Sequence, residues 1–207
     1  GLLVRPQTVR EYPHHRLAAH VLGYLGRPQP EDLPVLKEYG VRPDHLIGRT
    51  GLEHAFDAYL RGRSGGAMVE VDHRARRVRT LGQRKAEGGQ TVALTIDSGL
   101  QSLIEEAFGG QPGAAVVLDP RSGEVLALVS VPSFDPAAFL GGQARQVQGY
   151  LNDPQAPLLN RATMAAYTPG SITKLITAVA ALEHKVITPS TTIVCPGFVR
   201  IGDRTFS

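Results

Sequence analysis

The sequence predicts a mixed chain of helices and strands that is organised in two parts. Residues 1–88 are rich in Arg, Gly, Pro and His and contain only short apolar stretches. A turn-rich segment, "KAEGGQ" at 85–90, follows, and the later segments have longer strand and helix periodicities. With 42% hydrophobic and 20% charged residues, the composition is that of a folded chain. We therefore expect a small extended mixed domain over 1–88, and over 89–207 the first part of an α/β domain with an antiparallel sheet and helices.

Composition excludes several classes of function. A net charge of +3 over 207 residues gives no reason to expect nucleic acid as a partner. The single cysteine, Cys195, cannot form an internal disulfide or a cysteine-based zinc site, and we expect it to be buried and inert. The His and acidic residues show no metal-ligand spacing, so we expect neither metal nor cofactor. No window is long and apolar enough for a membrane span, and the chain opens without Met, so we expect a piece of a longer protein.

Four short elements are expected in the first part. Residues 16–26 are compatible with a short strand or helix that packs through leucines and valine. The order of acidic residues and Gly at 30–40 predicts a short helix. Residues 51–65 have helical spacing of Leu and aromatic side chains and close with glycines, which predicts a second helix. Residues 67–82 alternate apolar and polar side chains, so we expect a strand or hairpin.

The second part opens with a strand, a helix and a hairpin in the expected order. The β-branched run at 91–96 predicts a strand, and Asp97 or Ser98 can cap the helix that follows. Across 113–131, "GAAVVLD", "PRSG" and "EVLALVSV" predict strand, tight turn and strand. This pattern indicates an antiparallel hairpin with at least one buried face.

A serine and a lysine stand one helical turn apart near residue 170. Pro169 ends any preceding helix and Gly170 permits close approach of the backbone, so Ser171 lies at a helix N-terminus. Lys174 lies on the same face, within reach of the Ser hydroxyl. The helix, expected to continue to His184, is apolar nearly all round and is therefore expected to be buried. A desolvated lysine has a lowered pKa and can act as a base for a serine nucleophile.

The residues alone leave a second interpretation open. Serine is an ordinary N-cap residue, and lysine can extend from a helix toward water. Of the nine serines, Ser171 is the one with Lys three residues later. Spacing alone therefore does not decide between an acyl-transfer pair and a capped helix with a surface lysine.

Longer phrases around this motif resemble one family. S-x-x-K occurs in penicillin-binding proteins and class A β-lactamases, and "NRATMAAYTPGSITK" is similar to the active-site stretch of class B penicillin-binding proteins. "REYPHHRLAAHVLGYLG" and "GRTGLEHAFDAYLRGRSG" resemble the signatures of the N-terminal pedestal domain of that family. "VALTIDSGLQ" and "AAVVLDPRSGEVLALVSVPSFDP" resemble the opening of its transpeptidase domain. "YLNDPQAPLLNRA" is more similar to the elongation type, penicillin-binding protein 2, than to the division type, penicillin-binding protein 3.

The resemblance implies a fold and a chemistry. It implies a pedestal domain of the dimerisation type over 1–88, and the N-terminal part of a serine β-lactamase-like transpeptidase domain over 89–207. It implies that Ser171 is the acyl-accepting nucleophile, that Lys174 is its base, and that the backbone N–H of Ser171 beside Gly170 helps to bind the oxyanion. The substrate would be a peptidoglycan stem peptide, and β-lactams would acylate the same serine. The family's S-x-N and K-T-G motifs do not occur in the chain, so we expect the piece to be catalytically incomplete.

Four further residues are expected to support the structure. By resemblance, Glu53 holds the pedestal together through buried hydrogen bonds. Asn160 and Arg161 lie upstream of the serine and are expected to brace the active-site helix, with substrate contact as the alternative. His20, in an apolar stretch, is interpreted as a structural residue. The arginines of 74–80 are interpreted as a solvated strand face, with lipid headgroups or anionic glycan as the alternative.

The resemblance also implies partners and a location. We expect a single N-terminal membrane anchor outside this sequence and a catalytic part on the extracytoplasmic, periplasmic side. The expected partners are a membrane glycosyltransferase of the shape–elongation–division–sporulation class and an elongation scaffold protein, both bound through the pedestal. The alternative functions are a β-lactam receptor without turnover, an interaction module that acts through the pedestal, or a division-type enzyme.

Overall fold

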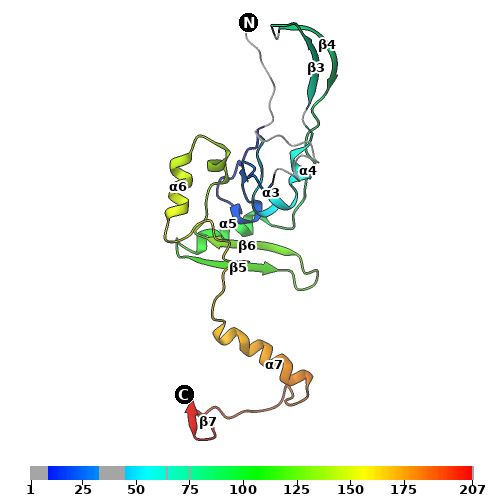
Figure 1. Cartoon of the computed structure of the whole chain (residues 1–207). Coiled ribbons are helices and arrows are strands. Elements are labelled where there is room, and N and C mark those ends of the chain that lie inside the picture. Colours follow the sequence, from blue (N-terminus) through cyan, green and yellow to red (C-terminus); the bar gives the residue numbers. More distant parts are fainter. Residues whose placement is uncertain (1–8, 33–44, 64, 75, 207) are drawn as a thin grey trace. The chain divides into compact units, whose positions relative to one another are not determined.

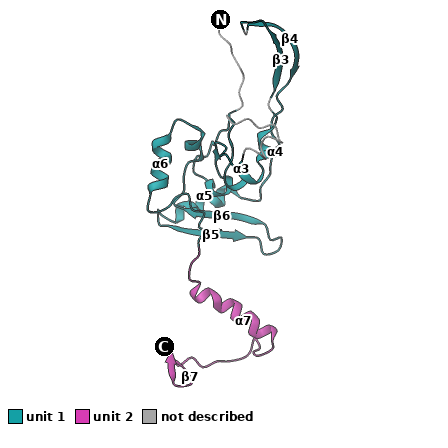
Figure 2. Cartoon of the chain, in the orientation of Figure 1, with its two compact units in different colours: residues 1–165 teal, residues 166–207 magenta. Residues whose placement is uncertain are grey.

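The structure, a computed structural model, describes residues 9–32, 45–63, 65–74 and 76–206. The short helix expected at 30–40 lies almost entirely outside the described residues. The chain forms two compact units, residues 1–165 and 166–207 (Figure 2). Both units contain helices and strands, which confirms the mixed class. Within the described ranges, no helix has the length and apolar character needed to cross a bilayer.

Short helices and strands form the N-terminal part of the described first unit (Figure 1). The stretch 16–26 forms both elements that its pattern allowed, a helical turn and a two-residue strand. The expected helix at 51–65 is present but divides at Phe56, whose φ of −115° and ψ of 21° interrupt the helical backbone. The elements are α1 (Ala19–Leu22), β1 (Leu25–Gly26), β2 (Ile47–Gly48), α3 (Gly51–Ala55) and α4 (Asp57–Arg61), with β1 and β2 antiparallel.

The Glu53 carboxylate is the polar centre of this region. Its side chain belongs to α3, and the residue is only 5% exposed. One oxygen accepts a hydrogen bond from the Tyr12 hydroxyl at 3.0 Å, and the Arg10 guanidinium contacts both oxygens at 3.0 and 2.9 Å. Burial, followed by the nearby Glu53 charge, raises the pKa of Tyr12 far above its ordinary value. Gly48 is required here, because a Cβ at this position would lie 1.8 Å from the Glu53 carbonyl oxygen.

The alternating segment at 67–82 forms the expected hairpin. Strands β3 (Gly66–Val71) and β4 (Arg77–Arg84) pair antiparallel and project from the rest of the unit as a two-stranded ribbon (Figure 1). The register shifts twice, so that Val78 and Leu81 on β4 have no partner on β3. Such bulges increase the local twist and redirect side chains.

The expected capped helix and second hairpin are also present. Helix α5 (Ser98–Ala107) begins after Asp97, whose side chain accepts a hydrogen bond from the Leu100 N–H at 2.9 Å. Strands β5 (Gly113–Leu118) and β6 (Val125–Val131) pair antiparallel, and β6 is the more buried of the two. Helix α5 packs against β6.

The prediction of a strand at 91–96 is wrong. This segment has no ladder with any described strand and makes single bonds to the edge of β6 instead. The Thr95 hydroxyl donates to the Val125 carbonyl at 2.6 Å, and the Asp97 N–H donates to the Leu126 carbonyl at 2.9 Å. Further along β6, the buried side-chain amide of Gln101 makes the bonds that a neighbouring strand would make. It donates to the Leu128 carbonyl at 3.0 Å and accepts from the Leu128 N–H at 2.9 Å. The chain turns into α5 before a ladder can form.

Aromatic packing joins the start of the chain to the segment after β6. Phe134 is 2% exposed and makes edge contacts with His20, Tyr24, Phe139 and Tyr150, with ring centroids 5.1–6.3 Å apart. The loop expected after the hairpin contains the 3-10 helix η1 (Pro136–Leu140), which is followed by α6 (Ala144–Asn152).

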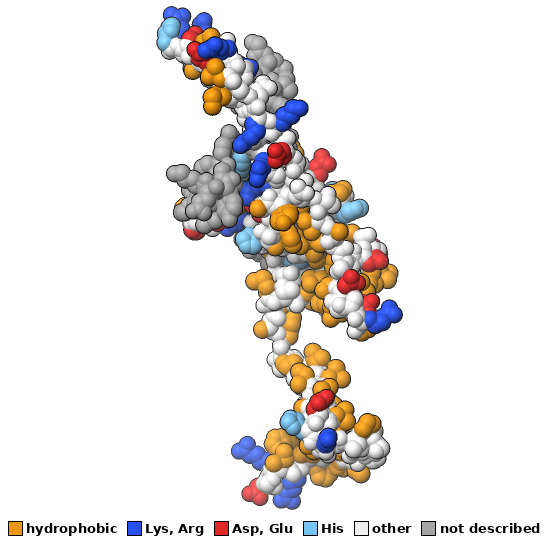
Figure 3. Space-filling model, turned by 90° about the vertical axis from the view of Figure 1, so that its right-hand side faces the viewer, with side chains coloured by type: hydrophobic (Ala, Val, Ile, Leu, Met, Phe, Trp, Pro, Cys, Tyr) orange, Lys and Arg blue, Asp and Glu red, His pale blue; other side chains and the backbone are white. Residues whose placement is uncertain are grey.

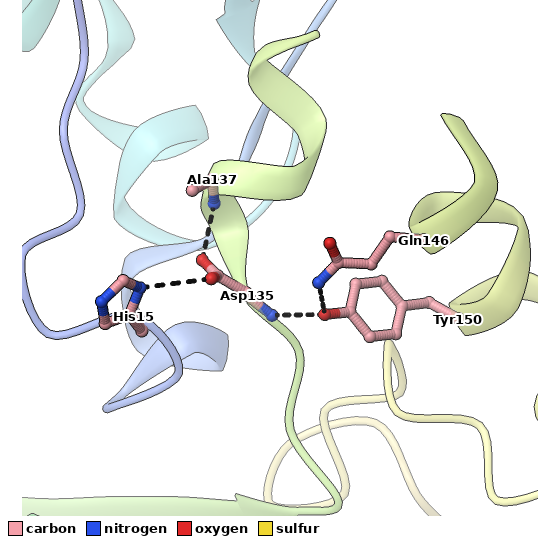
Figure 4. Close-up of polar contacts among 5 residues, drawn as sticks. All are labelled: His15, Asp135, Ala137, Gln146 and Tyr150. Atoms are coloured by element: carbon pink, nitrogen blue, oxygen red, sulfur yellow. Dashed lines mark hydrogen bonds and ion pairs between the residues drawn. The ribbon is translucent and has the colours of Figure 1, made fainter. Parts of the chain in front are cut away.

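Hydrogen bonds line the same junction. The buried His20 ring donates from Nε2 to the Pro157 carbonyl at 2.9 Å, which confirms its structural interpretation. Asp135 accepts from the Ala137 N–H at 2.9 Å and lies 3.3 Å from His15 Nδ1, while its own N–H donates to the Tyr150 hydroxyl at 3.1 Å (Figure 4). Residues 15–24 and the segment 134–157 are therefore parts of one unit.

The second unit is small and open. It consists of the 3-10 turn η2 (Gly170–Ile172), helix α7 (Thr173–Glu183) and the antiparallel pair β7 (Val199–Ile201) and β8 (Arg204–Phe206). The expectation that α7 is buried is wrong, since no residue of the helix is buried and Ile176 is 72% exposed. Cys195 is also exposed, contrary to expectation. The physical reason is that this unit holds too few elements to cover an apolar helix on all sides.

The Glu53 centre predicts a measurable loss of stability. Replacing Glu53 with Gln removes the charge that the Arg10 guanidinium contacts, and we expect the free energy of unfolding to fall by about 3 kcal/mol. Tyr12→Phe removes one hydrogen bond and should cost about 1 kcal/mol. Urea denaturation followed by circular dichroism measures both, with the exposed Glu106→Gln as the matched control. Equal stability of the Glu53 and Glu106 variants would contradict the assigned role.

The His20 contact predicts a pH dependence of stability. Burial, with a smaller contribution from the Arg161 charge, lowers the pKa of His20 below its ordinary value of 6.5. The unfolded chain therefore binds the proton more readily than the folded chain, so this stabilisation is complete above pH 6.5 and is lost as the pH falls. Urea midpoints between pH 7.5 and 5.5 should decline less for His20→Gln than for the parent chain. The exposed His14→Gln should keep the parent slope, and a parent slope in His20→Gln would contradict the assignment.

Candidate active site

Ser171 lies in a tight turn whose shape depends on the two residues before it. Gly170 has φ of +52°, in the left-handed region that favours glycine, and no neighbouring atom lies within 4 Å of where its Cβ would be. The Ile172 N–H donates to the Pro169 carbonyl at 3.3 Å and closes the turn. Gly170 is therefore selected by backbone conformation, and the open space beside it leaves the Ser171 backbone accessible.

A threonine hydroxyl connects this turn to helix α7, and a second one bonds within the first turns of the helix. Thr173 Oγ1 donates to the Gly170 carbonyl at 2.7 Å, and Thr177 Oγ1 donates to the Thr173 carbonyl at 3.0 Å. The sequence reasoning missed Thr173 as a contributor. The available signal was a Thr three residues after a Gly at a helix start, a spacing at which the hydroxyl can reach back to the carbonyl.

Ser171 and Lys174 are placed on consecutive turns of the same short segment. Ser171 is in η2 and Lys174 is in the first turn of α7, and both are exposed. In the described part of the chain, no hydrogen bond joins the Ser171 hydroxyl to the Lys174 amine. The first N–H groups of a helix lack partners within it and favour negative charge, so the position suits an oxyanion formed at Ser171.

Asn160 and Arg161 lie in the other compact unit, where Arg161 bonds to the turn that precedes it and Asn160 bonds to a residue that follows it. The Arg161 guanidinium donates to the carbonyls of Gln155 and Ala156, the latter at 3.1 Å. The Arg161 N–H donates to the Ser130 hydroxyl on β6 at 2.9 Å. Asn160 Oδ1 accepts from the Ala162 N–H at 3.2 Å. These bonds attach the segment 155–162 to β6, and the bracing of α7 by this pair stays a prediction.

Glu53 belongs to the polar centre described above and borders a small apolar pocket. The pocket has a volume of about 100 Å³ and is far below the size that encloses a drug-sized ligand. Leu22, Leu52, Phe56, Leu60, Val92 and Leu94 line it together with Glu53. Among the residues that the structure describes, no group of three or more His, Cys, Asp or Glu side chains is arranged to hold a metal ion.

Two protein-family models match consecutive stretches of the chain. The penicillin-binding protein dimerisation domain matches residues 1–94, and the penicillin-binding protein transpeptidase domain matches residues 113–207. The second match contains Ser171 and Lys174. The first contains Glu53 and the ribbon of β3 and β4.

Similar proteins agree with these matches. The peptidoglycan D,D-transpeptidase MrdA of Haemophilus influenzae is 41% identical over 203 residues, which is 96% of this chain and 31% of that protein. The chain thus spans about a third of the length of the curated relatives it matches.

Solved structures show the same relationship. In a complex of penicillin-binding protein PBP2 with MreC from Helicobacter pylori, the matching chain has a TM-score of 0.78 and 32% identity, over 95% of this chain and 36% of that one. Pseudomonas aeruginosa PBP2 in complex with WCK 5153 gives 0.77 and 32%, over 98% of this chain and 42% of that one. With both domain types matched in order and the fold shared along nearly its whole length, the chain belongs to the penicillin-binding proteins.

Proposed function

We propose that this chain is part of an elongation-type peptidoglycan D,D-transpeptidase in which Ser171 is the nucleophile and Lys174 is the general base. One observation carries the proposal: the S-x-x-K pair lies at the start of α7, within a chain that is 41% identical to a D,D-transpeptidase over 96% of its length. The identity of that relative, MrdA, favours the elongation type over the division type.

The first half of the proposed reaction forms an acyl-enzyme. Ser171 Oγ attacks the carbonyl carbon between the last two D-Ala residues of a stem peptide, and the Lys174 amine accepts the hydroxyl proton. The C–N bond to the terminal D-Ala breaks, and its amine leaves with that proton. The stem peptide is then held as an ester of Ser171. The Ser171 N–H stabilises the oxyanion of the tetrahedral intermediate, and Gly170 leaves space for the substrate backbone.

The second half closes the cross-link. An amine from a neighbouring stem peptide attacks the ester carbonyl, an amide bond forms, and the Ser171 oxygen recovers a proton as the ester bond breaks. A β-lactam follows the first half only: its ring amide opens on Ser171, and the leaving nitrogen stays attached to the acyl group. A stable ester on Ser171 is therefore the expected product with penicillin.

The remaining parts of the chain have supporting roles in this proposal. Residues 1–88 form the pedestal that docks an elongation scaffold protein and a membrane glycosyltransferase of the shape–elongation–division–sporulation class, and 89–207 begin the transpeptidase domain. The H. pylori relative in complex with MreC supports the scaffold partner. Glu53 holds the pedestal, and Asn160 and Arg161 support the active-site region. The catalytic part works on the periplasmic side of a membrane to which the whole protein is anchored.

The acylation chemistry predicts a serine-specific penicillin adduct. Intact mass after incubation of the whole protein with benzylpenicillin, followed by peptide mapping, should place the adduct on Ser171. Ser171→Ala should abolish it, whereas Ser102→Ala, a matched serine of helix α5, should not change it. Lys174→Gln removes the base and should slow acylation by about 10²-fold or more.

Two outcomes would change the assignment. An adduct that survives in Ser171→Ala would refute the nucleophile. Adduct formation without any cross-linked product from stem-peptide donor and acceptor would instead favour a β-lactam receptor that does not turn over.

A further inference from the structure

The ribbon of β3 and β4 concentrates the positive charge of the chain. Residues 66–85 contain six Arg or Lys and two acidic side chains, a net charge of +4, whereas the whole chain carries +3. The rest of the chain is therefore slightly acidic. Arg79 contacts Glu70, and the other acidic residue, Asp72, accepts backbone N–H bonds from Arg74 and Arg76 at the turn. The excess of cations therefore belongs to this one projecting element.

The same ribbon exposes large apolar side chains. Met68, Val69 and Val71 on β3 are 37–69% exposed, as are Val78 and Leu81 on β4 at 62% and 54%. The last two are the bulge residues, which have no partner across the ladder. Figure 3 shows hydrophobic side chains along the ribbon, beside the basic side chains. The ribbon therefore exposes apolar and basic side chains together, and its apolar side chains keep between 37% and 69% of their surface exposed.

A two-stranded ribbon of this kind is poorly stabilised in water by itself. Isolated two-stranded hairpins are marginal, since three strands or a packed face are normally needed for stability. All residues of β3 are exposed, and so are all but one of β4. An element with exposed apolar area and excess positive charge is stabilised when it binds a surface that has an apolar interior beneath an anionic layer.

We propose that the β3–β4 ribbon binds the surface of a bilayer that contains anionic lipids. The arginines at its turn, Arg74, Arg76 and Arg77, contact lipid phosphates, while Val78 and Leu81 enter the boundary between headgroups and acyl chains. This places a membrane contact in the pedestal itself, independent of the proposed anchor.

Because basic and apolar side chains alternate along the ribbon, a lipid bilayer fits it better than an anionic glycan or an acidic protein does. An anionic glycan matches the arginines but offers no apolar medium for Val78 and Leu81. An acidic protein requires a matching face of about 800 Å² on each side, which a ribbon of two strands about 5 Å apart provides poorly. A fluid lipid surface adapts to a narrow element and satisfies both components.

Vesicle binding tests the electrostatic component. The 207-residue chain, with its fold checked by circular dichroism, is floated with phosphatidylcholine vesicles with and without phosphatidylglycerol. We expect binding only with phosphatidylglycerol, and weaker binding at high salt. Each arginine should raise the affinity for these vesicles about fivefold, so R74Q/R76Q/R77Q should weaken binding by about a hundredfold. The matched triple variant R121Q/R145Q/R200Q removes equal charge from exposed sites elsewhere and should bind within about threefold of the parent chain.

Fluorescence tests the insertion of the bulge residues. The chain has no tryptophan, so Val78→Trp introduces a single reporter. Its emission should shift to the blue on vesicles that contain phosphatidylglycerol, whereas Leu103→Trp, at an equally exposed position on α5, should not shift. The proposal is overturned if the folded chain does not bind these vesicles, if both triple variants lose binding equally, or if the Val78→Trp emission is unchanged. Retention on poly-glutamate without vesicle binding would assign the ribbon to an acidic protein instead.

Discussion

Burial of the Phe134 ring is the interaction on which the first compact unit depends. The ring follows strand β6 in the sequence, yet two of its four aromatic neighbours, His20 and Tyr24, come from the beginning of the chain. The contact closes a loop of more than one hundred residues, and its cost in chain entropy is recovered only if the apolar area is well buried. His20 adds a hydrogen bond to the Pro157 carbonyl at the same place. The change of composition near residue 88 therefore does not coincide with a break in packing.

Local features of the sequence were enough to predict most elements. The Asp97 cap, the hairpin at 113–131 and the ribbon follow from spacing and turn residues that act over a few positions. The composition of 91–96 fits a strand, but the prediction failed because the Gln101 side chain occupies part of the β6 edge with which that strand would pair. The Phe134 cluster could not be predicted, since nothing in a single sequence pairs residues 20 and 134. Long-range partners, rather than propensities, were the missing information.

The candidate site shows the same division between local and distant causes. The turn at Ser171 is built by neighbours: Gly170 supplies the left-handed backbone, and the Thr173 hydroxyl bonds back to the Gly170 carbonyl. These features explain why S-x-x-K spacing was readable from sequence. The surroundings of the helix could not be predicted from the sequence. An all-round apolar pattern shows that a helix needs packing partners, but it does not show which segments supply them. In its own unit, α7 keeps Leu175 and Val179 exposed, so the position of the nucleophile is set locally while its environment is not.

The Gln101 amide has a consequence for how the sheet of β5 and β6 can grow. On the side of β6 away from β5, the Leu128 N–H and carbonyl are bonded to this side chain, and the Leu126 carbonyl is bonded to the Asp97 N–H. A further strand cannot add there without displacing a buried amide. The outer edge of β5 carries no such block among the described residues, and its Val116 and Leu118 side chains are exposed. Extension of this sheet, whether by a native strand or by edge-to-edge aggregation, is thereby directed to one side.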